Sequence, residues 1–207
     1  MEEVETVRNR IDTIAAKVDD KKLGQAIQKL DRAASIRENE SDPETAKQAL
    51  DSVQEAKKLL ADVRKAHNKP IRQMDLDSCL RFFNESVREH ARQTEATAFD
   101  NLARTAQRAI DSNNGDFENF LDQMRRRNFD ILWRQDWFVV DRFKQMATEY
   151  WQFVDRRQHN ELVANGVEAI KADDIDKLRQ VMYQLYSIRS SSGDDGDMST
   201  AANIGRG

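Results

Sequence analysis

The stretch that decides the fold is Leu162-Val-Ala-Asn-Gly-Val-Glu-Ala169-Ile170, which a short turn separates from Asp174-Ile175-Asp-Lys-Leu178. A similar pattern lies 60 residues earlier, where Leu102-Ala-Arg-Thr-Ala-Gln-Arg-Ala109-Ile110 is followed by a turn and Asp116-Phe117-Glu-Asn-Phe120. Each stretch has the spacing of a helix, a turn and a second helix. A repeated helical pair must bury its apolar face against a neighbouring pair. The repeat therefore predicts an all-α fold of antiparallel helical hairpins that form a bundle.

The composition supports long helices and narrows the classes of partner. The 207 residues include only seven Gly and two Pro. A chain of many short strands would need more of these turn-forming residues, so the low number favours long helices. The net charge of -4 lacks the basic footprint of most nucleic-acid-binding modules. No apolar run approaches the ~20 residues of a membrane span, and the acidic N-terminus does not resemble a secretory signal. The single Cys79 cannot form an internal disulfide and fits a reducing compartment, so we expect a cytoplasmic protein.

The chain divides into two predicted helical units and a tail. We expect an N-terminal unit over 1–70, a C-terminal unit over 71–189, and a linker over 67–75, where a helix should end before Pro70. The composition of 190–207 changes to Ser, Gly and Asp, which cannot bury enough apolar surface to become ordered. We therefore expect a disordered C-terminal tail.

Apolar spacing predicts most of the individual helices. In the N-terminal unit the apolar positions are Val4, Val7, Ile11, Ile14 and Val18, then Leu23, Ile27, Leu30 and Ala34, then Leu50, Val53, Leu60 and Val63. The pair Asp19-Asp20 offers a cap for the second helix, and Asp42 can cap the third. In the C-terminal unit a long helix should break near 94–97, and further helices are expected over 116–133, 135–157, 160–171 and 174–189. A turn is expected over 111–115, where Gly and Asn tolerate positive φ.

No residue pattern identifies a reaction. The chain has no glycine-rich phosphate-binding loop, and its three histidines lie at no metal-ligand spacing, so we expect no catalytic, cofactor or metal site. His67, His90 and His159 are expected at the surface. Cys79 is expected to be a buried core thiol rather than a nucleophile.

An aromatic block is the strongest candidate for partner binding. Trp133 and Trp137 share a face at i, i+4, and Phe138 and Phe143 widen that face. Such a helix is usually buried, and the core interpretation is preferred. If one side stayed uncovered, these four residues would form a docking patch, since tryptophan is enriched at binding hot spots. A third possibility is that Arg125, Arg126, Arg127, Arg134 and Arg142, interleaved with the aromatic residues, bind single-stranded nucleic acid. The acidic pI of 5.5 argues against this third possibility.

These residues resemble a known family. Ala109-Ile110, Asp116-Phe117, the aromatic stretch that ends at Phe143, and the segment from Ala169 to Leu185 are similar to the C-terminal helical region of bacterial DnaK-like heat-shock chaperones. The resemblance covers about 99–189, and a looser one over 19–63 is similar to the helical lid of such chaperones. It implies a piece of a longer protein, whose ATPase and peptide-binding domains lie upstream, and no catalytic residues in this chain.

Three functions are compared on this basis. The first is a non-catalytic lid or C-terminal interaction region of a DnaK-like chaperone, which binds or gates protein clients or co-chaperone-like partners. The second is a free-standing helical adaptor that binds a partner peptide in a groove, although two repeats are fewer than such arrays usually need. The third is an enzyme with an active site in a helix bundle, which would require converging Glu and His residues that the sequence lacks. The oligomeric state is left open.

Overall fold

The computed structural model describes residues 2–37 and 43–189, and these residues are helical with short connections. The N-terminal elements are α1 (Glu2–Ala15), α2 (Lys21–Arg37), α3 (Pro43–Ala66) and α4 (Asn68–Phe82). Next come a π-helical turn η1 (Phe83–Val87), a 3₁₀ turn η2 (Arg88–His90), α5 (Gln93–Asp111) and α6 (Phe117–Trp133). The last elements are α7 (Asp136–Thr148), the 3₁₀ turn η3 (Tyr150–Gln152), α8 (Arg156–Lys171) and α9 (Ile175–Ile188). The prediction of an all-α fold is confirmed.

The described residues form two compact units. The first contains the chain up to Asp75 together with Ile110–Asn113, and the second contains Leu76–Ala109 and the chain from Asn114 on. The predicted disordered tail, 190–207, lies outside the described residues, and so does the candidate cap Asp42.

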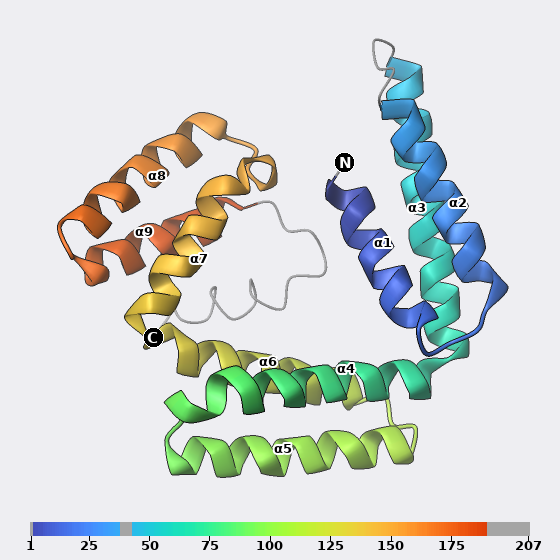
Figure 1. Ribbon diagram of the computed structural model, residues 1–207, viewed down its shortest axis with the longest axis horizontal. Helices are drawn as coiled ribbons and strands as arrows, with labels where there is room; N and C mark the ends of the chain where they lie inside the picture. Colours follow the sequence, from blue (N-terminus) through green and yellow to red (C-terminus); the bar gives the residue numbers. More distant parts are fainter. Residues whose placement is uncertain (1, 38–42, 190–207) are drawn as a thin grey trace. The chain divides into compact units, whose positions relative to one another are not determined.

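The first unit is a helical bundle in which α1 lies along the α2–α3 hairpin (Figure 1). Its core is the predicted apolar stripe of each helix, closed by one residue of α4; the buried members include Ile11, Ile14, Leu30, Val53, Val63 and Ile71. Asp20 caps α2 as expected, because its carboxylate accepts the Lys22 backbone N–H at 2.8 Å. Leu50, predicted to be buried, is instead 50% exposed.

The predicted helix end before Pro70 is confirmed, since α3 ends at Ala66, but residues 67–75 are not a loop, because α4 begins at Asn68 and runs through them. Pro70 is the third residue of this helix, where the backbone N–H would have no intrahelical partner, so proline costs no hydrogen bond. Two polar contacts lie beside this start, each at 3.0 Å: the Arg64–Asp75 ion pair, and a hydrogen bond between His67 Nε2 and the Asp20 carboxylate. A proline after a short turn can therefore open a helix as well as end one.

In the second unit α7, α8 and α9 pack around one core (Figure 1). Its fully buried members are Val139, Met146, Ala169, Leu178, Met182 and Leu185, and the Phe143 ring among them is only 2% exposed. The Phe83 and Phe99 rings stack at 3.7 Å and join η1 to α5. The helical break expected near 94–97 comes earlier, at Ala91, whose backbone is extended.

The helix expected over 135–157 ends at Thr148. Phe153 is extended and pairs with Arg189 in an isolated antiparallel bridge. Asp155 then begins α8 by accepting the Gln158 N–H at 3.0 Å. The connector between α7 and α8 (149–155) therefore has a fixed non-helical path that the apolar spacing did not predict.

The two halves of the repeat end their first helix in the same way. Ala109 and Ile110 accept the backbone N–H groups of Asn114 and Asn113 at 2.8 and 3.1 Å. The corresponding bonds in the second half, from Asp174 to Ala169 and from Asp173 to Ile170, measure 2.9 and 3.1 Å. This pair of bonds is the Schellman arrangement, which needs a residue with positive φ. Asn113 (φ 52°) and Asp173 (φ 54°) occupy that position, and not Gly115.

Candidate interaction surfaces

The structure separates the four aromatic residues predicted to form a patch. Trp133 and Phe143 are buried in the core of the second unit. The Trp133 indole N–H donates to the Tyr183 hydroxyl at 3.1 Å, and the Trp133 ring stacks on Phe129 at 5.3 Å. Phe138 is partly buried and lies edge-on to Phe129 at 5.9 Å. These contacts place Trp133, Phe138 and Phe143 in or against the core.

Trp137 alone of the four is largely exposed, with 52% of its surface accessible to solvent. The core interpretation is therefore wrong for this residue. The reason is a break in the helix: Gln135 is extended (φ -90°, ψ 123°), so α6 ends at Trp133 and α7 begins at Asp136. Because Trp133 and Trp137 lie on two different helices, their spacing of four residues no longer places them on one face.

A part-buried histidine lies beside the exposed tryptophan. The His90 ring is 5.7 Å from the Trp137 ring, tilted by 48°, and its Nε2 atom lies 3.4 Å from the Glu89 carboxylate. On the other side Asp136, which begins α7, pairs with Arg179 of α9 at 2.8 Å. We call Trp137, Phe138 and His90 the Trp137 surface. It combines a large aromatic ring with polar groups at its edge.

An ion pair fixes the helix junction that presents Trp137. The Glu95 carboxylate accepts two hydrogen bonds from the Arg134 guanidinium, at 2.6 and 2.8 Å, and a third from the Arg92 backbone N–H at 2.8 Å. These bonds, that of Arg134 foremost, lower the pKa of Glu95 to about 2. Because Arg134 directly precedes the break at Gln135, this bidentate pair ties the start of α5 to the α6–α7 junction.

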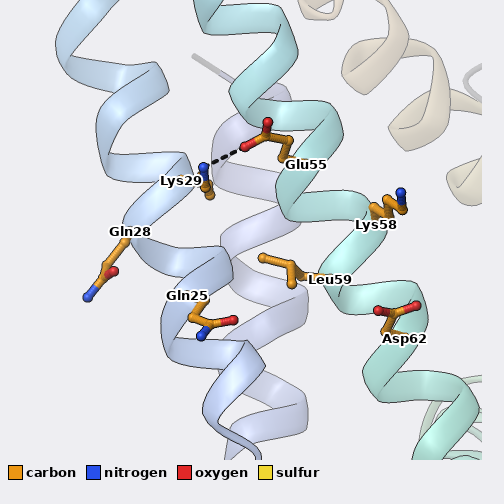
Figure 2. A pocket seen from close by; sticks show the side chains of 7 residues that line it. All are labelled: Gln25, Gln28, Lys29, Glu55, Lys58, Leu59 and Asp62. Carbon is orange, nitrogen blue, oxygen red and sulfur yellow. Dashed lines mark ion pairs between the residues drawn. The ribbon is translucent and has the colours of Figure 1, made fainter.

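A second candidate surface is a groove of about 370 Å³ on the first unit, between α2 and α3. Figure 2 shows Leu59 between the two helices and the Lys29–Glu55 ion pair across them, with 2.5 Å between the Lys29 Nζ and Glu55 Oε2 atoms. The remaining lining residues are polar: Gln25, Gln28, Lys58 and Asp62. Hydrogen bonding from Lys29 lowers the pKa of Glu55, and the same effect of Lys22 lowers the pKa of Asp62. The groove therefore presents charges of both signs around a small apolar floor.

The other residues singled out from the sequence serve the fold. Cys79 is buried as expected; its sulfur lies 3.7 Å from the Asn128 side-chain amide, and burial raises its pKa to about 11. His159, expected at the surface, is instead buried against Phe153, with ring centroids 4.2 Å apart, and its Nε2 lies 3.1 Å from the Met146 carbonyl oxygen. Within 2–37 and 43–189 no three His, Cys, Asp or Glu side chains gather as metal ligands.

Three of the five arginines singled out in the aromatic segment have defined partners inside the protein: Arg125, Arg134 and Arg142. Arg125 lies 3.6 Å from Asp122, Arg134 binds Glu95, and Arg142 donates to the Tyr186 hydroxyl at 3.1 Å. Internal partners of this kind reduce the positive charge available to a phosphate backbone. The arrangement thus gives no support to single-stranded nucleic acid as a ligand.

Comparison with known proteins identifies no relative: no family model, curated protein or solved structure matches this chain. In the part of the chain that the structure describes, no helix has the length and apolar character needed to cross a membrane.

Proposed function

We propose that this chain is a non-catalytic helical module that binds a protein partner through the Trp137 surface. The observation that carries the proposal is the exposure of Trp137, in a block whose other large aromatic residues lie in or against the core. Tryptophan is among the residues that contribute most to binding energy when a partner covers them. A single exposed tryptophan on a fixed helix end is well suited to anchor such a partner.

The rigidity of the surface supports this function. Association is less costly when the binding residues are already held in place, since less conformational entropy is lost. The bidentate Glu95–Arg134 pair holds the junction before Trp137, and the Asp136–Arg179 pair holds the first residue of α7. Trp137 is therefore presented by two helices whose ends are tied to neighbouring helices.

A more specific form of the proposal is that the chain is a lid or C-terminal interaction region of a DnaK-like chaperone. Its support is the resemblance of residues 99–189, and the helix–turn–helix repeat within that range is consistent with it. In this form the partner is an unfolded client or a co-chaperone-like protein in the cytoplasm. ATP hydrolysis would be the task of domains that precede this chain in a longer protein.

The alternative proposal is a helical adaptor that binds a partner peptide in the α2–α3 groove. The observation in its favour is the groove itself, where Leu59 offers an apolar contact and the surrounding Lys, Gln, Glu and Asp side chains offer hydrogen bonds. Small binding sites commonly combine an apolar floor with a few polar groups that fix orientation. The two proposals place the partner on different units and can be separated by substitution.

The test is a fluorescence anisotropy titration of a labelled, reduced and carboxymethylated client protein with the full chain. Trp137→Ala should weaken binding at least tenfold, because a hot-spot truncation costs ~2 kcal/mol or more. Leu50→Ala is the matched control, since Leu50 is an equally exposed apolar residue of the first unit. Lys58→Glu reverses a charge at the edge of the groove and reports on the alternative.

Each outcome separates the proposals. Binding that is lost in Trp137→Ala and kept in the other two variants supports the Trp137 surface. Binding lost only in Lys58→Glu favours the adaptor. If neither Trp137→Ala nor Lys58→Glu changes the affinity, the client binds at neither proposed surface. If the full chain shows no saturable binding of the unfolded client, the proposal is restricted to folded partners.

A further inference from the structure

The residues beside Trp137 belong to a turn of unusual backbone geometry. At Phe83 the path of α4 changes to the π-helical turn η1, and the 3₁₀ turn η2 follows and carries His90. Phe83 and Val87 of η1 are buried, so the turn is anchored in the core. Single π-helical turns are rare and occur frequently at functional sites. Here the irregular backbone brings the outer end of the turn next to the Trp137 ring.

Three carboxylates lie beside the Trp137 surface, and all are well exposed. Glu89 contacts the ring of the adjacent histidine at 3.4 Å, and its side chain is 74% exposed. Asp136 directly precedes Trp137 in α7, and its side chain is 67% exposed. The Asp176 side chain contacts the same arginine as Asp136 and is 91% exposed. We call Glu89, Asp136 and Asp176 the acidic rim.

The charge of the acidic rim is only partly balanced within the protein. Arg179 lies 2.8 Å from Asp136 and 3.1 Å from Asp176, so one guanidinium serves two carboxylates. The Arg179 side chain is only 22% exposed, which leaves the negative groups on the outside. The histidine that Glu89 contacts carries no fixed charge. Three carboxylates and one guanidinium therefore leave two negative charges at the rim.

The arginines next to these residues in the chain are engaged with other carboxylates. Arg88 donates to both carboxylate oxygens of Asp100, at 2.6 and 3.4 Å. Arg134 binds Glu95, and the charge of Arg92 acts on the same carboxylate. The start of α5 thus keeps one positive charge in excess, against two negative charges at the rim. A partner that approaches this surface therefore meets a net negative charge.

An exposed tryptophan ring with carboxylates near its edge is suited to bind an arginine side chain. A cation is attracted to the face of an aromatic ring, and tryptophan gives the strongest attraction. The guanidinium group is planar, so it can stack on the indole and donate hydrogen bonds to carboxylates at the same time. Lysine carries a more strongly hydrated point charge and has no flat face that stacks. The chemistry of the surface therefore favours arginine over lysine and over neutral side chains.

We propose that the Trp137 surface binds an arginine-containing segment of its protein partner. The guanidinium stacks on the Trp137 ring, its N–H groups point to the acidic rim, and Phe138 offers an apolar contact to a neighbouring side chain. This inference rests on the proposed function, because it names the chemistry of the partner at the same site. Since the charged groups are exposed, salt weakens the contact.

The experiment is an NMR titration of the isotope-labelled full chain at neutral pH. The probe is a capped heptapeptide that contains two arginines among glycine and leucine residues. In the matched probes both arginines are replaced by citrulline, which is neutral and has nearly the same shape, or by lysine. The signal to follow is the Trp137 indole N–H, identified by its absence in Trp137→Phe. We expect saturable shifts with a dissociation constant below about 1 mM for the arginine peptide. Citrulline should weaken binding at least about fivefold and lysine about twofold.

A pair of charge substitutions tests the acidic rim. Glu89→Gln with Asp176→Asn removes two rim charges and leaves Arg179 with one aspartate partner, so it should weaken binding of the arginine peptide at least about fivefold. Glu161→Gln with Glu168→Gln is the matched control, because these exposed carboxylates of α8 each pair with a neighbour on the same helix. The control should leave the affinity unchanged. Salt at about 0.5 M should remove most of the difference between the two double variants.

Three results would overturn the inference. Equal affinity for the arginine and citrulline peptides would mean that the ring selects apolar contact and not charge. Absence of saturable shifts, or an equal loss of affinity in both double variants, would exclude the rim as a recognition element. Shifts of the Trp137 signal that depend on protein concentration without any peptide would assign the surface to a second copy of the chain.

Failure of this inference is distinguishable from failure of the proposed function. If Trp137→Ala weakens binding of the unfolded client and the rim substitutions do not, the surface binds its partner without a requirement for arginine. If client binding is insensitive to Trp137→Ala while the arginine peptide binds as expected, the client-binding proposal fails and the preference for arginine remains. All the rim and control substitutions replace exposed side chains, so they leave the buried core intact.

Discussion

Replacement of Gly166 by alanine tests the packing of the second unit most directly. Gly166 lies in the middle of α8 and is buried. A β-carbon built on it would lie 3.0 Å from the Cδ2 atom of Phe143 and closer still to Cε2 and Cζ of the same ring. Phe143 is itself only 2% exposed, so its ring has no route to solvent. The glycine therefore permits α7 and α8 to approach each other.

The expected cost follows from two opposing terms. Alanine in a helix interior is favoured over glycine by about 0.5–1 kcal/mol. Inserting a methyl group into a closely packed core typically costs about 1–3 kcal/mol, because a rigid ring or the backbone must shift. The second term is the larger, since the atoms in the way belong to an aromatic ring and not to the end of a flexible side chain. We expect Gly166→Ala to lower the free energy of unfolding by about 1–2 kcal/mol.

Urea unfolding followed by tryptophan fluorescence is the assay, because all three tryptophans belong to the second unit. Gly115→Ala is the control within that unit, since a β-carbon there meets nothing within 4 Å and φ is not positive. It should leave stability unchanged or raise it by up to about 1 kcal/mol. Gly24→Ala, which is equally open in α2, should raise the stability of the first unit when circular dichroism is followed.

The double substitution Gly166→Ala with Phe143→Leu completes the argument. If the ring is the obstacle, the cost of Gly166→Ala must be smaller in the Phe143→Leu background than in the native one. The reasoning is refuted if Gly166→Ala is as stable as Gly115→Ala. It is also refuted if the two costs simply add.

Three further outcomes are expected. The free energy of unfolding should fall as the pH drops from about 4.5 toward 2. The reason is that the pKa of Glu95 is lowered from 4.5 to about 2 in the folded protein, and its pairing with Arg134 is lost on protonation. In urea titrations at several pH values, Glu95→Gln should flatten this part of the stability–pH curve. The Cys79 thiol should react with a disulfide reagent at neutral pH only as fast as the chain opens, and rapid reaction of the folded protein would contradict its burial. Asn113→Ala and Asp173→Ala should each lower the free energy of unfolding by about 1 kcal/mol, because alanine disfavours the positive φ at these positions. Asn113→Gly and Asp173→Gly should not destabilise the protein. Equal melting temperatures for the alanine and glycine variants would contradict this.

Where helices lie could largely be predicted from the sequence, because apolar spacing reflects which face each helix buries. The stripe from Val4 to Val18 and the one from Leu178 to Leu185 are buried as their spacing indicates. Spacing alone could not predict Leu50, whose exposure depends on which neighbouring helices reach that turn. Nor could it distinguish a proline that ends a helix from one that begins it, as at Pro70.

The surface features were harder to predict, because they depend on where a helix stops. The break between α6 and α7 was predicted, since separate helices were expected over 116–133 and 135–157. The exposure of Trp137 was not predicted, because its i, i+4 spacing to Trp133 was interpreted as one face across that break, where Gln135 is extended. The path of the connector over 149–155 follows from the end of α7 at Thr148 and depends on Arg189, about 40 residues away in sequence. The end of α7 at Thr148 has no nearby Gly or Pro to signal it. In contrast, the burial of Cys79 follows from its position on an apolar helix face and was predicted correctly.

The internal repeat shows how equal sequence patterns can lead to unequal packing. Both halves end the first helix with the same pair of capping bonds and the same left-handed residue, so the repeat is identical up to Asn114 and Asp174. The second helix then begins at once after Asp174, whereas two further residues, Gly115 and Asp116, precede α6. Two residues add up to about 7 Å of reach. α8 and α9 pack closely along their length, and α5 and α6 do not approach each other to the same degree. The longer turn of the first half therefore accompanies a looser pairing of its two helices.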